Sequence, residues 1–449
     1  MSAINVKKYA FSHYKYWIFM MLIWLIAFIR TAVSIDIPVF SYIGICLVAA
    51  ICCTREEAVA LMCSLLPLSG VFQFRLALWV ISSIYIFKIK RLRVKYFTPF
   101  ILMFMWELLH FSQTNVGIYG LFREFSELFA LSVLLMDKEV DYSDGLPIRS
   151  LAYSTIFGTL INYIALKKLY GYDITSLTRF GKLASETSDF QGLLNPNVNS
   201  YICVIAISGL WLLRFYGKDQ YKDKFFIYFL IMTIFLTQSK SALICLLIAY
   251  FLYVLFAKGR VNISIKQILS IFSTVVSFVF VFGVLLRDML MKTLDRFFVT
   301  DISTGRVVIF SFYHQHITSS LENLICGIGL YRYTERITNI YGNIWEFFPG
   351  LATVFNGEVV YKPSHFSIQE VVVVWGIVGV LLFVYLFYMM FRHSKRKCHS
   401  LNAVTFWIIL IYGLQGHLVS SDVMLLSLFY SLICLEYTAL SNVGENEML

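Results

Sequence analysis

Long apolar runs separated by short polar segments cover most of this chain. A helix needs about 20 predominantly apolar residues to cross a lipid bilayer. Fourteen candidate spans follow, at residues 16–33, 38–53, 57–70, 72–88, 96–112, 118–136, 149–166, 197–215, 225–237, 241–257, 266–286, 366–391, 401–416 and 423–439. Pro67 and Gly70 break the third run, so residues 57–88 form either two spans or a bent, re-entrant hairpin, which would leave twelve. The pattern predicts an all-α, polytopic membrane protein with 12–14 transmembrane helices.

The composition excludes a water-soluble protein of this size. Hydrophobic residues make up 59% of the 449 residues and charged residues only 14%. A soluble domain carries about 25% charged residues, which it needs to cover a water-facing surface. The formal net charge of +10 would suit a nucleic-acid partner. In a membrane protein the same excess reports orientation, so the positions of the basic residues decide between the two.

The basic residues fall on one side of the bundle if the spans alternate in direction. They cluster before the first span and after the fourth, eighth, tenth and twelfth, at residues 7–15, 88–95, 214–224, 258–266 and 392–397. The short loops of the opposite side near residues 113–117 and 416–421 contain no Lys or Arg. Since cytoplasmic loops are enriched in these residues, both termini are predicted to be cytoplasmic. Topology therefore explains the positive charge, and no nucleic-acid partner is expected.

Three regions follow from this topology. Residues 1–286 are predicted to form an N-terminal transmembrane bundle of about 11 spans, with an outer loop at 167–195. Residues 287–365 form a large extracytoplasmic loop, with one amphipathic helix expected from its first residue and a second helix from Arg306. Residues 366–449 contain the C-terminal transmembrane helices.

Several charged residues fall inside apolar runs, near their predicted outer ends. A charge deep in a span costs several kcal/mol unless it lines a cavity or is paired. We therefore expect either a wet, charged cavity that opens outward or a set of interhelical salt bridges. The spacing of Arg123 and Glu127, one helical turn apart, favours a salt bridge for that pair. The residues concerned are Arg75, Glu107, His110, Arg123, Glu124, Glu127 and Lys240.

Four polar features lie on the predicted outer side. They are the break TQSKSALI at 237–244 with Lys240, the STGR segment ending at Arg306, the CGIGL turn at 326–330, and the segment from 364 to 379 with His365 and Glu370. A cation at a helix N-terminus is favourable where a bound anion shares the site, because the helix dipole itself favours anions. A histidine titrates near neutrality and accepts a proton from an attacking hydroxyl. The set suits a reaction with a hydroxyl nucleophile and an anionic leaving group.

In this order around one large outer loop, the features resemble those of the O-antigen ligase and O-antigen polymerase (Wzy-type) superfamily. The resemblance covers roughly residues 190–385 and begins with a polar segment at Asn195. Its further positions here are Gln238 and Ser239 beside Lys240, Gly305 with Arg306, Gly327 with Gly329, His365, and Gln369–Glu370 ahead of Gly376 and Gly379. One departure is Lys240, because the family usually has Arg there and Lys loses the bidentate fork.

The resemblance implies a GT-C-like helical bundle and a metal-independent glycosyltransferase without a cofactor. Its donor and acceptor would be undecaprenyl-pyrophosphate-linked oligosaccharides at the outer face of a bacterial cytoplasmic membrane. His365 would be the base or orienter of the acceptor hydroxyl. Arg306 and Lys240 would hold the pyrophosphate, and Arg179 would either add a phosphate contact or anchor the loop at the interface. Other partners would be membrane lipid, a chain-length regulator and a flippase.

The residues themselves agree with chemistry that needs neither metal nor nucleotide. The chain contains no DxD motif, no phosphate-binding glycine loop and no cysteine or histidine pair with zinc spacing. A repeat-unit polymerase is the leading hypothesis, and a ligase of the same superfamily is the first alternative. A lipid-linked oligosaccharide flippase is the alternative from another class, although the halves show no internal repeat and one outer loop of about 79 residues dominates.

Overall fold

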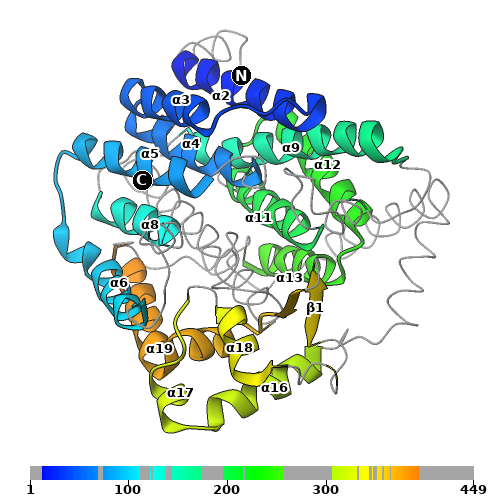
Figure 1. Cartoon of the computed structure of the whole chain (residues 1–449). Helices are drawn as coiled ribbons and strands as arrows, with labels where there is room; N and C mark the ends of the chain where they lie inside the picture. The colour runs from blue at the N-terminus through cyan, green and yellow to red at the C-terminus, as the bar shows by residue number, and fades with distance from the viewer. Residues whose placement is uncertain are drawn as a thin grey trace.

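The computed structural model describes residues 13–68, 74–111, 122, 125–137, 144–173, 180, 196–215, 218–256, 306–330, 333–342, 346, 351–355, 358–364 and 366–393. These residues form helices and one short two-stranded hairpin (Figure 1). The all-α prediction is confirmed for the described part of the chain, apart from this hairpin. The spans expected at 266–286, 401–416 and 423–439 lie outside the described residues, as does the amphipathic helix expected from Arg287.

The helices of the N-terminal region follow the predicted runs closely. They are α2 Tyr14–Phe28, continued by the π-helical turn Ile29–Val33, then α3 Val39–Cys52, α4 Arg55–Leu65 with the 3₁₀ turn Leu66–Leu68, α5 Phe74–Lys88, the 3₁₀ turn Val94–Phe97, α6 Thr98–Phe111, α8 Ser126–Met136, α9 Leu146–Tyr170, α11 Pro196–Phe215, α12 Tyr221–Thr237 and α13 Lys240–Phe256.

The predicted outer loop contains short elements, followed by one long helix. The elements are α16 Arg306–Thr318, α17 Leu321–Ile325, α18 Tyr333–Tyr341, the strands β1 Ala352–Phe355 and β2 Glu358–Tyr361, and finally α19 Ser367–His393. The strands are antiparallel, with Ala352 opposite Tyr361 and Phe355 opposite Glu358. The tight register forms a small hairpin that the sequence analysis did not predict.

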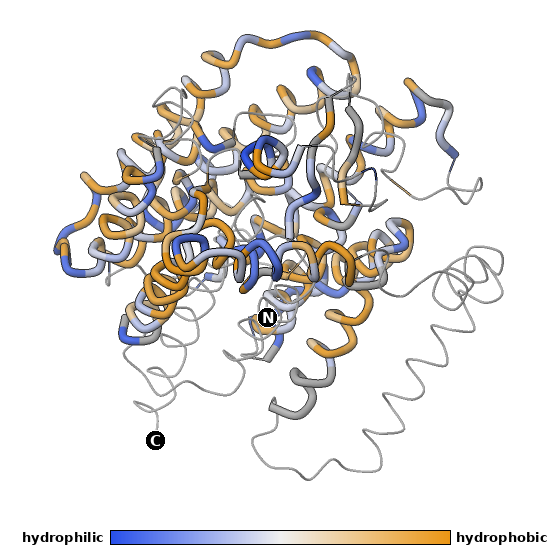
Figure 2. The backbone as a smooth tube through the Cα atoms, turned by 60° about the horizontal axis from the view of Figure 1, so that its bottom comes forward, coloured by the Kyte–Doolittle hydropathy of each residue, from blue (hydrophilic) through white to orange (hydrophobic). Residues whose placement is uncertain are grey.

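Two described helices are long and apolar enough to cross a membrane, at Tyr14–Val33 and Ile368–Met390. Both also expose large apolar side chains, such as Met21 at 61% and Leu381 at 62% exposure. Figure 2 shows hydrophobic positions along most of the helices, on outer as well as inner ones. Length and composition thus make a membrane location possible, and the number of 12–14 crossing helices remains a prediction.

Two short helices, α4 and α8, form the centre of the packing. All residues of α8 are buried, and so are those of α4 from Glu57 onward. Each helix has 11 residues, a rise of about 17 Å, whereas a bilayer core is about 30 Å thick. Pro67 lies in the 3₁₀ turn that ends α4. Helix α4 alone is therefore too short to cross a bilayer, and whether residues 57–88 form two spans or a re-entrant hairpin stays a prediction.

Contacts at the two ends of α9 define two ends of the bundle. At the start of α9, Asp144 contacts His13, which precedes α2, with 3.3 Å between Nε2 and Oδ2. At its end, the Lys168 Nζ donates to the Ala32 carbonyl at 3.0 Å, so α2 and α9 are parallel. We name the two ends of the bundle the His13 end and the Lys168 end after these contacts.

The remaining contacts place the other helix termini. Asp223, in the first turn of α12, pairs with Arg149 in the first turn of α9. Asp137 directly follows α8, and its two carboxylate oxygens each accept a hydrogen bond from Arg55 at the start of α4. Lys88, at the end of α5, donates to the Cys53 carbonyl after α3. All these termini meet at the His13 end, which the basic loops predict to be cytoplasmic.

Candidate functional site

The junction between α12 and α13 carries three of the predicted site residues. Gln238 ends α12 with a left-handed backbone (φ 51°), and its N–H donates to the Phe235 carbonyl at 3.0 Å. A non-glycine residue in this conformation costs of order 1–3 kcal/mol, which the surrounding packing has to offset. Ser239 is 1% exposed, and its carbonyl accepts the N–H of Leu243 at 3.1 Å, so α13 starts at Lys240. The polar break in the sequence is therefore a sharp reversal between two helices.

The predicted outer loop at 167–195 attaches beside this junction. The Phe180 N–H donates to the carbonyl of Leu236, near the end of α12, at 3.0 Å. The Phe180 ring is buried and lies 5.8 Å from the Tyr172 ring, in a small cluster with Leu166. Arg179 lies outside the described residues. Its chain neighbour Phe180 contacts the end of α12. Lys240, the other residue expected to bind phosphate here, follows α12 in the chain.

A second corner forms where the first turn of α16 meets the start of α19. The Gln369 Nε2 donates to the Phe310 carbonyl at 2.7 Å, and the Ser364 Oγ donates to the Gln369 Oε1 at 2.6 Å. The rings of Phe310 and Phe366 lie edge to face with centroids 5.7 Å apart. Arg306 is the first residue of α16 and precedes Phe310 by one helical turn. His365 and Gly305 lie outside the described residues, although Ser364 and Phe366, the chain neighbours of His365, form this corner.

Glu370 is buried beneath α16 in the first turn of α19, with no exposed surface. Its N–H donates to the Phe366 carbonyl at 2.8 Å. Burial raises the pKa of Tyr313 on α16, and the negative charge of Glu370 raises it further. The neutral Tyr313 hydroxyl donates to the Lys362 carbonyl at 2.8 Å. Glu370 thus lies buried within the α16–α19 contact.

The turn at Gly327 and Gly329 packs into a break in α19. The break is at Gly376 (φ 64°, ψ −164°), a backbone conformation that is essentially restricted to glycine. A break in a helix releases carbonyls that need other donors. The Val373 and Val374 carbonyls accept the N–H groups of Ile328 at 3.0 Å and Gly329 at 2.7 Å.

The helix α6 closes this contact from the other side. The Trp106 Nε1 donates to the third released carbonyl, that of Trp375, at 3.2 Å. Glu107 is fully buried, and both its oxygens lie 3.0 Å from the N–H of Leu330. The indole of Trp375 also donates to Glu107, at 2.6 Å. Hydrogen bonds to an ionised acceptor contribute about 1.5–3 kcal/mol each. Glu107 therefore stabilises the packing of both the turn and the helix break against α6.

His110 and Arg336 flank the same turn. The two ring nitrogens of His110 lie 2.9 Å from the Cys326 carbonyl and 3.0 Å from the Trp106 carbonyl. The Arg336 guanidinium donates to the carbonyl of Ile328. Burial lowers the pKa of Arg336, while the carboxylate of Glu107 raises it. The sequence analysis did not identify Arg336, because one arginine on a polar loop helix carries no signal of its own.

Of the charged residues inside the apolar runs, Arg75, Glu107, His110 and Glu127 have side-chain contacts in the described part of the chain. Glu107, His110 and Glu127 are all buried. Glu127 forms an interhelical ion pair with Arg75, with 3.4 Å between Oε1 and Nε. The interhelical explanation therefore holds for Glu127, with a partner on α5, while Arg123 lies outside the described residues. Glu107 and His110 are hydrogen-bonded to the 326–330 turn, which is neither of the two expected explanations, a wet cavity or an interhelical salt bridge.

Comparisons with models of known protein families, with curated proteins and with solved structures found no match.

Proposed function

We propose that this protein is a polymerase that joins undecaprenyl-pyrophosphate-linked oligosaccharide repeat units at the outer face of a bacterial cytoplasmic membrane. The product would be O-antigen, capsular or a related polysaccharide. The proposal rests on the resemblance in the sequence together with the arrangement of the described residues at the predicted outer side.

The observation that carries the proposal is the contact between α16 and the start of α19. Arg306 and His365 are 59 positions apart in the sequence. The hydrogen bond from Gln369 to the Phe310 carbonyl brings the first turn of α16 against the chain on both sides of position 365. A cation at the start of α16 and a histidine between Ser364 and Phe366 would suit an anionic leaving group and a proton acceptor.

The proposed reaction is a displacement at the anomeric carbon of the donor's first sugar. An oxygen of the acceptor's sugar hydroxyl forms a bond to that carbon and transfers its proton to His365. The bond between the anomeric carbon and the pyrophosphate oxygen breaks, and the undecaprenyl pyrophosphate leaves as an anion. Arg306, Lys240 and Arg179 would stabilise the charge that develops on the leaving group.

The packing suits this division of roles. Lys240 and Arg306 each begin a helix, and the free N–H groups of a first turn add partial positive charge to a phosphate site. Buried Gln369 and Ser364 hold the chain on either side of His365 against α16. Such fixed positions reduce the reorganisation needed when charge develops.

The proposal is tested by complementing a strain that lacks this gene. His365→Ala and Arg306→Ala are expected to abolish long polysaccharide, while single lipid-linked repeat units accumulate. His314→Ala, an exposed histidine on α16, and Arg392→Ala, an exposed arginine at the far end of α19, are the matched controls and should keep the wild-type ladder. A normal polymer ladder in both site variants, at wild-type membrane abundance, would refute the assignment.

One observation favours a second candidate, a lipid-linked oligosaccharide flippase. The break at Gly376 makes α19 a discontinuous helix, and discontinuous helices are frequent at the binding sites of transporters. Chain extension by the purified protein on substrate that is already on the outer side would exclude a pure transporter. A ligase would instead leave long chains on the undecaprenyl carrier when it is inactivated, so blotting the carrier-linked pool separates it from a polymerase.

A further inference from the structure

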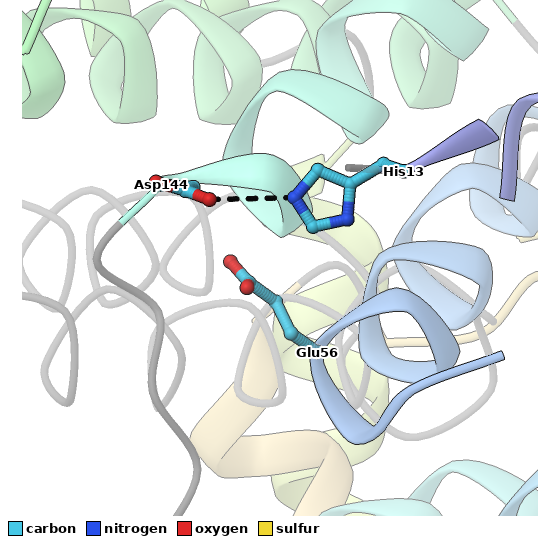
Figure 3. Close-up of side chains that lie close together, drawn as sticks. All are labelled: His13, Glu56 and Asp144. Atoms are coloured by element: carbon cyan, nitrogen blue, oxygen red, sulfur yellow. Dashed lines mark hydrogen bonds and ion pairs between the residues drawn. The ribbon is translucent and has the colours of Figure 1, made fainter. Parts of the chain in front are cut away.

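A histidine surrounded by carboxylates lies at the His13 end, far along the helices from the residues discussed above. His13 is 7% exposed and comes directly before α2. Glu56 and Glu57 lie in the first turn of α4, and Asp144 precedes α9. Figure 3 shows the side chains of His13, Glu56 and Asp144 directed toward one another from these three segments.

The hydrogen bonds of Glu57 fix the orientation of the imidazole. The Nδ1 of His13 lies 3.0 Å from Glu57 Oε1. The other oxygen of Glu57 accepts the N–H of Thr54 at 2.7 Å, within the capping box that starts α4. Glu57 is therefore held by its own helix, and its carboxylate accepts a hydrogen bond from the Nδ1–H of His13. A carboxylate that binds one ring nitrogen of a metal-ligating histidine in this way fixes the tautomer.

The second ring nitrogen, Nε2, faces carboxylate oxygens. It lies 3.3 Å from Asp144 Oδ2. A positive charge shared by these two atoms, from a proton or from a metal ion, makes this contact favourable. The ligand atoms of His13, Glu56 and Asp144 all lie within 4.8 Å of one another, so one cation would reach all three.

Three carboxylates, those of Glu56, Glu57 and Asp144, lie around one imidazole. An imidazole nitrogen with two carboxylate oxygens is a ligand set that suits first-row transition metals and Zn²⁺ more than Mg²⁺.

We propose that His13 Nε2, Glu56 and Asp144 bind one divalent transition-metal ion such as Zn²⁺, with Glu57 as the carboxylate that orients the imidazole. Bonds of about 2.1 Å would bring the ligand atoms to roughly 3.5 Å from one another, so the carboxylates would move inward by about 1 Å. The side chain of Asp144 is 45% exposed and can make this movement. The ion would join the starts of α2, α4 and α9 and is separate from the proposed polymerase reaction.

The test uses the full-length protein in detergent, freed of metal with a chelator. Co²⁺ replaces Zn²⁺ as a spectroscopic probe, because its visible absorption reports nitrogen and oxygen ligation. The wild-type protein is expected to bind one equivalent of Co²⁺ at this site, to release it to Zn²⁺ but not to Mg²⁺, and to unfold at a higher temperature when loaded.

Glu56→Gln and Asp144→Asn each remove one ligand from a partly exposed side chain and should weaken Co²⁺ binding at least tenfold. His314→Ala and Glu322→Gln change exposed residues of α16 and α17 and should bind as the wild type does. Absence of stoichiometric Co²⁺ binding overturns the proposal, and so does a loss of less than tenfold in either ligand variant. The elution profile in size-exclusion chromatography shows that each variant is folded.

Discussion

The packing of the 326–330 turn into the break of α19 makes a quantitative prediction for Gly376→Ala. Gly376 has φ 64° and ψ −164°, and a Cβ there would collide with the Ile325 carbonyl and lie 2.6 Å from the Cys326 nitrogen. Alanine is strained in this backbone conformation by about 1–3 kcal/mol. The two N–H bonds to the Val373 and Val374 carbonyls contribute about 1 kcal/mol each and lengthen when the backbone shifts. We expect a loss of about 3–5 kcal/mol in all.

Two other glycines separate the parts of this estimate. Gly171, after α9, has φ 62° but open space where the methyl group of an alanine would lie, so Gly171→Ala should lose only about 1–2 kcal/mol of backbone strain. Gly44, within α3, has open space and ordinary helical φ, so Gly44→Ala should gain about 0.5–1 kcal/mol. The three variants should therefore rank, from most to least stable, in the order Gly44→Ala, Gly171→Ala and Gly376→Ala.

The assay is thermal unfolding of the purified protein in one detergent at one scan rate. A change of 1 kcal/mol shifts the Tm by about 2–4 °C in a domain of 150–250 residues, and by less in a longer chain. Gly376→Ala should therefore lower the Tm by several degrees more than Gly171→Ala does. A Gly376→Ala protein that is as stable as Gly171→Ala would refute the contact between the turn and the break.

Three further predictions concern the buried polar contacts. Glu107→Ala should lower the Tm by more than Glu107→Gln, because Ala leaves two buried donors unsatisfied at about 1–3 kcal/mol each, whereas Gln keeps one acceptor; equal Tm values would contradict this. Arg149→Met should lower the free energy of unfolding by about 3–5 kcal/mol, because it removes the partner of the buried Asp223 charge. Adding Asp223→Leu to it should recover stability in unfolding measurements, and a double variant that recovers none would contradict the ion pair. Gln369→Leu should lose the bond to the Phe310 carbonyl and reduce polymer length in the complementation assay without loss of membrane abundance; an unchanged ladder would count against the α16–α19 corner.

The helices were largely predictable because hydropathy sets their positions. The run at 38–53 became α3 at Val39–Cys52, and the run at 72–88 became α5 at Phe74–Lys88. Helix α9 extends beyond its predicted 149–166, because its last turn contains Lys167 and Lys168, which hydropathy excludes but a helix C-terminus favours. Strand β2, by contrast, has only four residues, so its pattern of apolar and polar positions is too short to distinguish a strand from a loop.

The side-chain contacts of the site were much less predictable. Glu107 meets Leu330 and Trp375 across 223 and 268 positions, and no periodicity links residues at such separations. The sequence indicated that Glu107 had to be paired or hydrated, since a charge in an apolar run requires compensation. The partners, Leu330 and Trp375, belong to the turn and to the helix that pack together at the break of Gly376, which the sequence does not predict.

The carboxylate cluster around His13 illustrates the same limit. Its ligand atoms come from the starts of three helices, so no short motif with metal spacing exists for the sequence to reveal. The absence of a DxD motif and of cysteine or histidine pairs with zinc spacing led us to expect no metal. Helix starts gather at one end of an alternating bundle, and acidic residues are favoured there by the helix dipole, which is how the cluster forms.

The central claim is tested most directly by polymerisation with purified components. The protein is reconstituted in liposomes with undecaprenyl-pyrophosphate-linked repeat units and no nucleotide sugar. We predict a ladder of polymer and release of undecaprenyl pyrophosphate with the wild type and with His314→Ala, and neither product with His365→Ala or Arg306→Ala. Polymer formation by His365→Ala at the wild-type rate, or no polymer from the wild-type protein, would contradict the account.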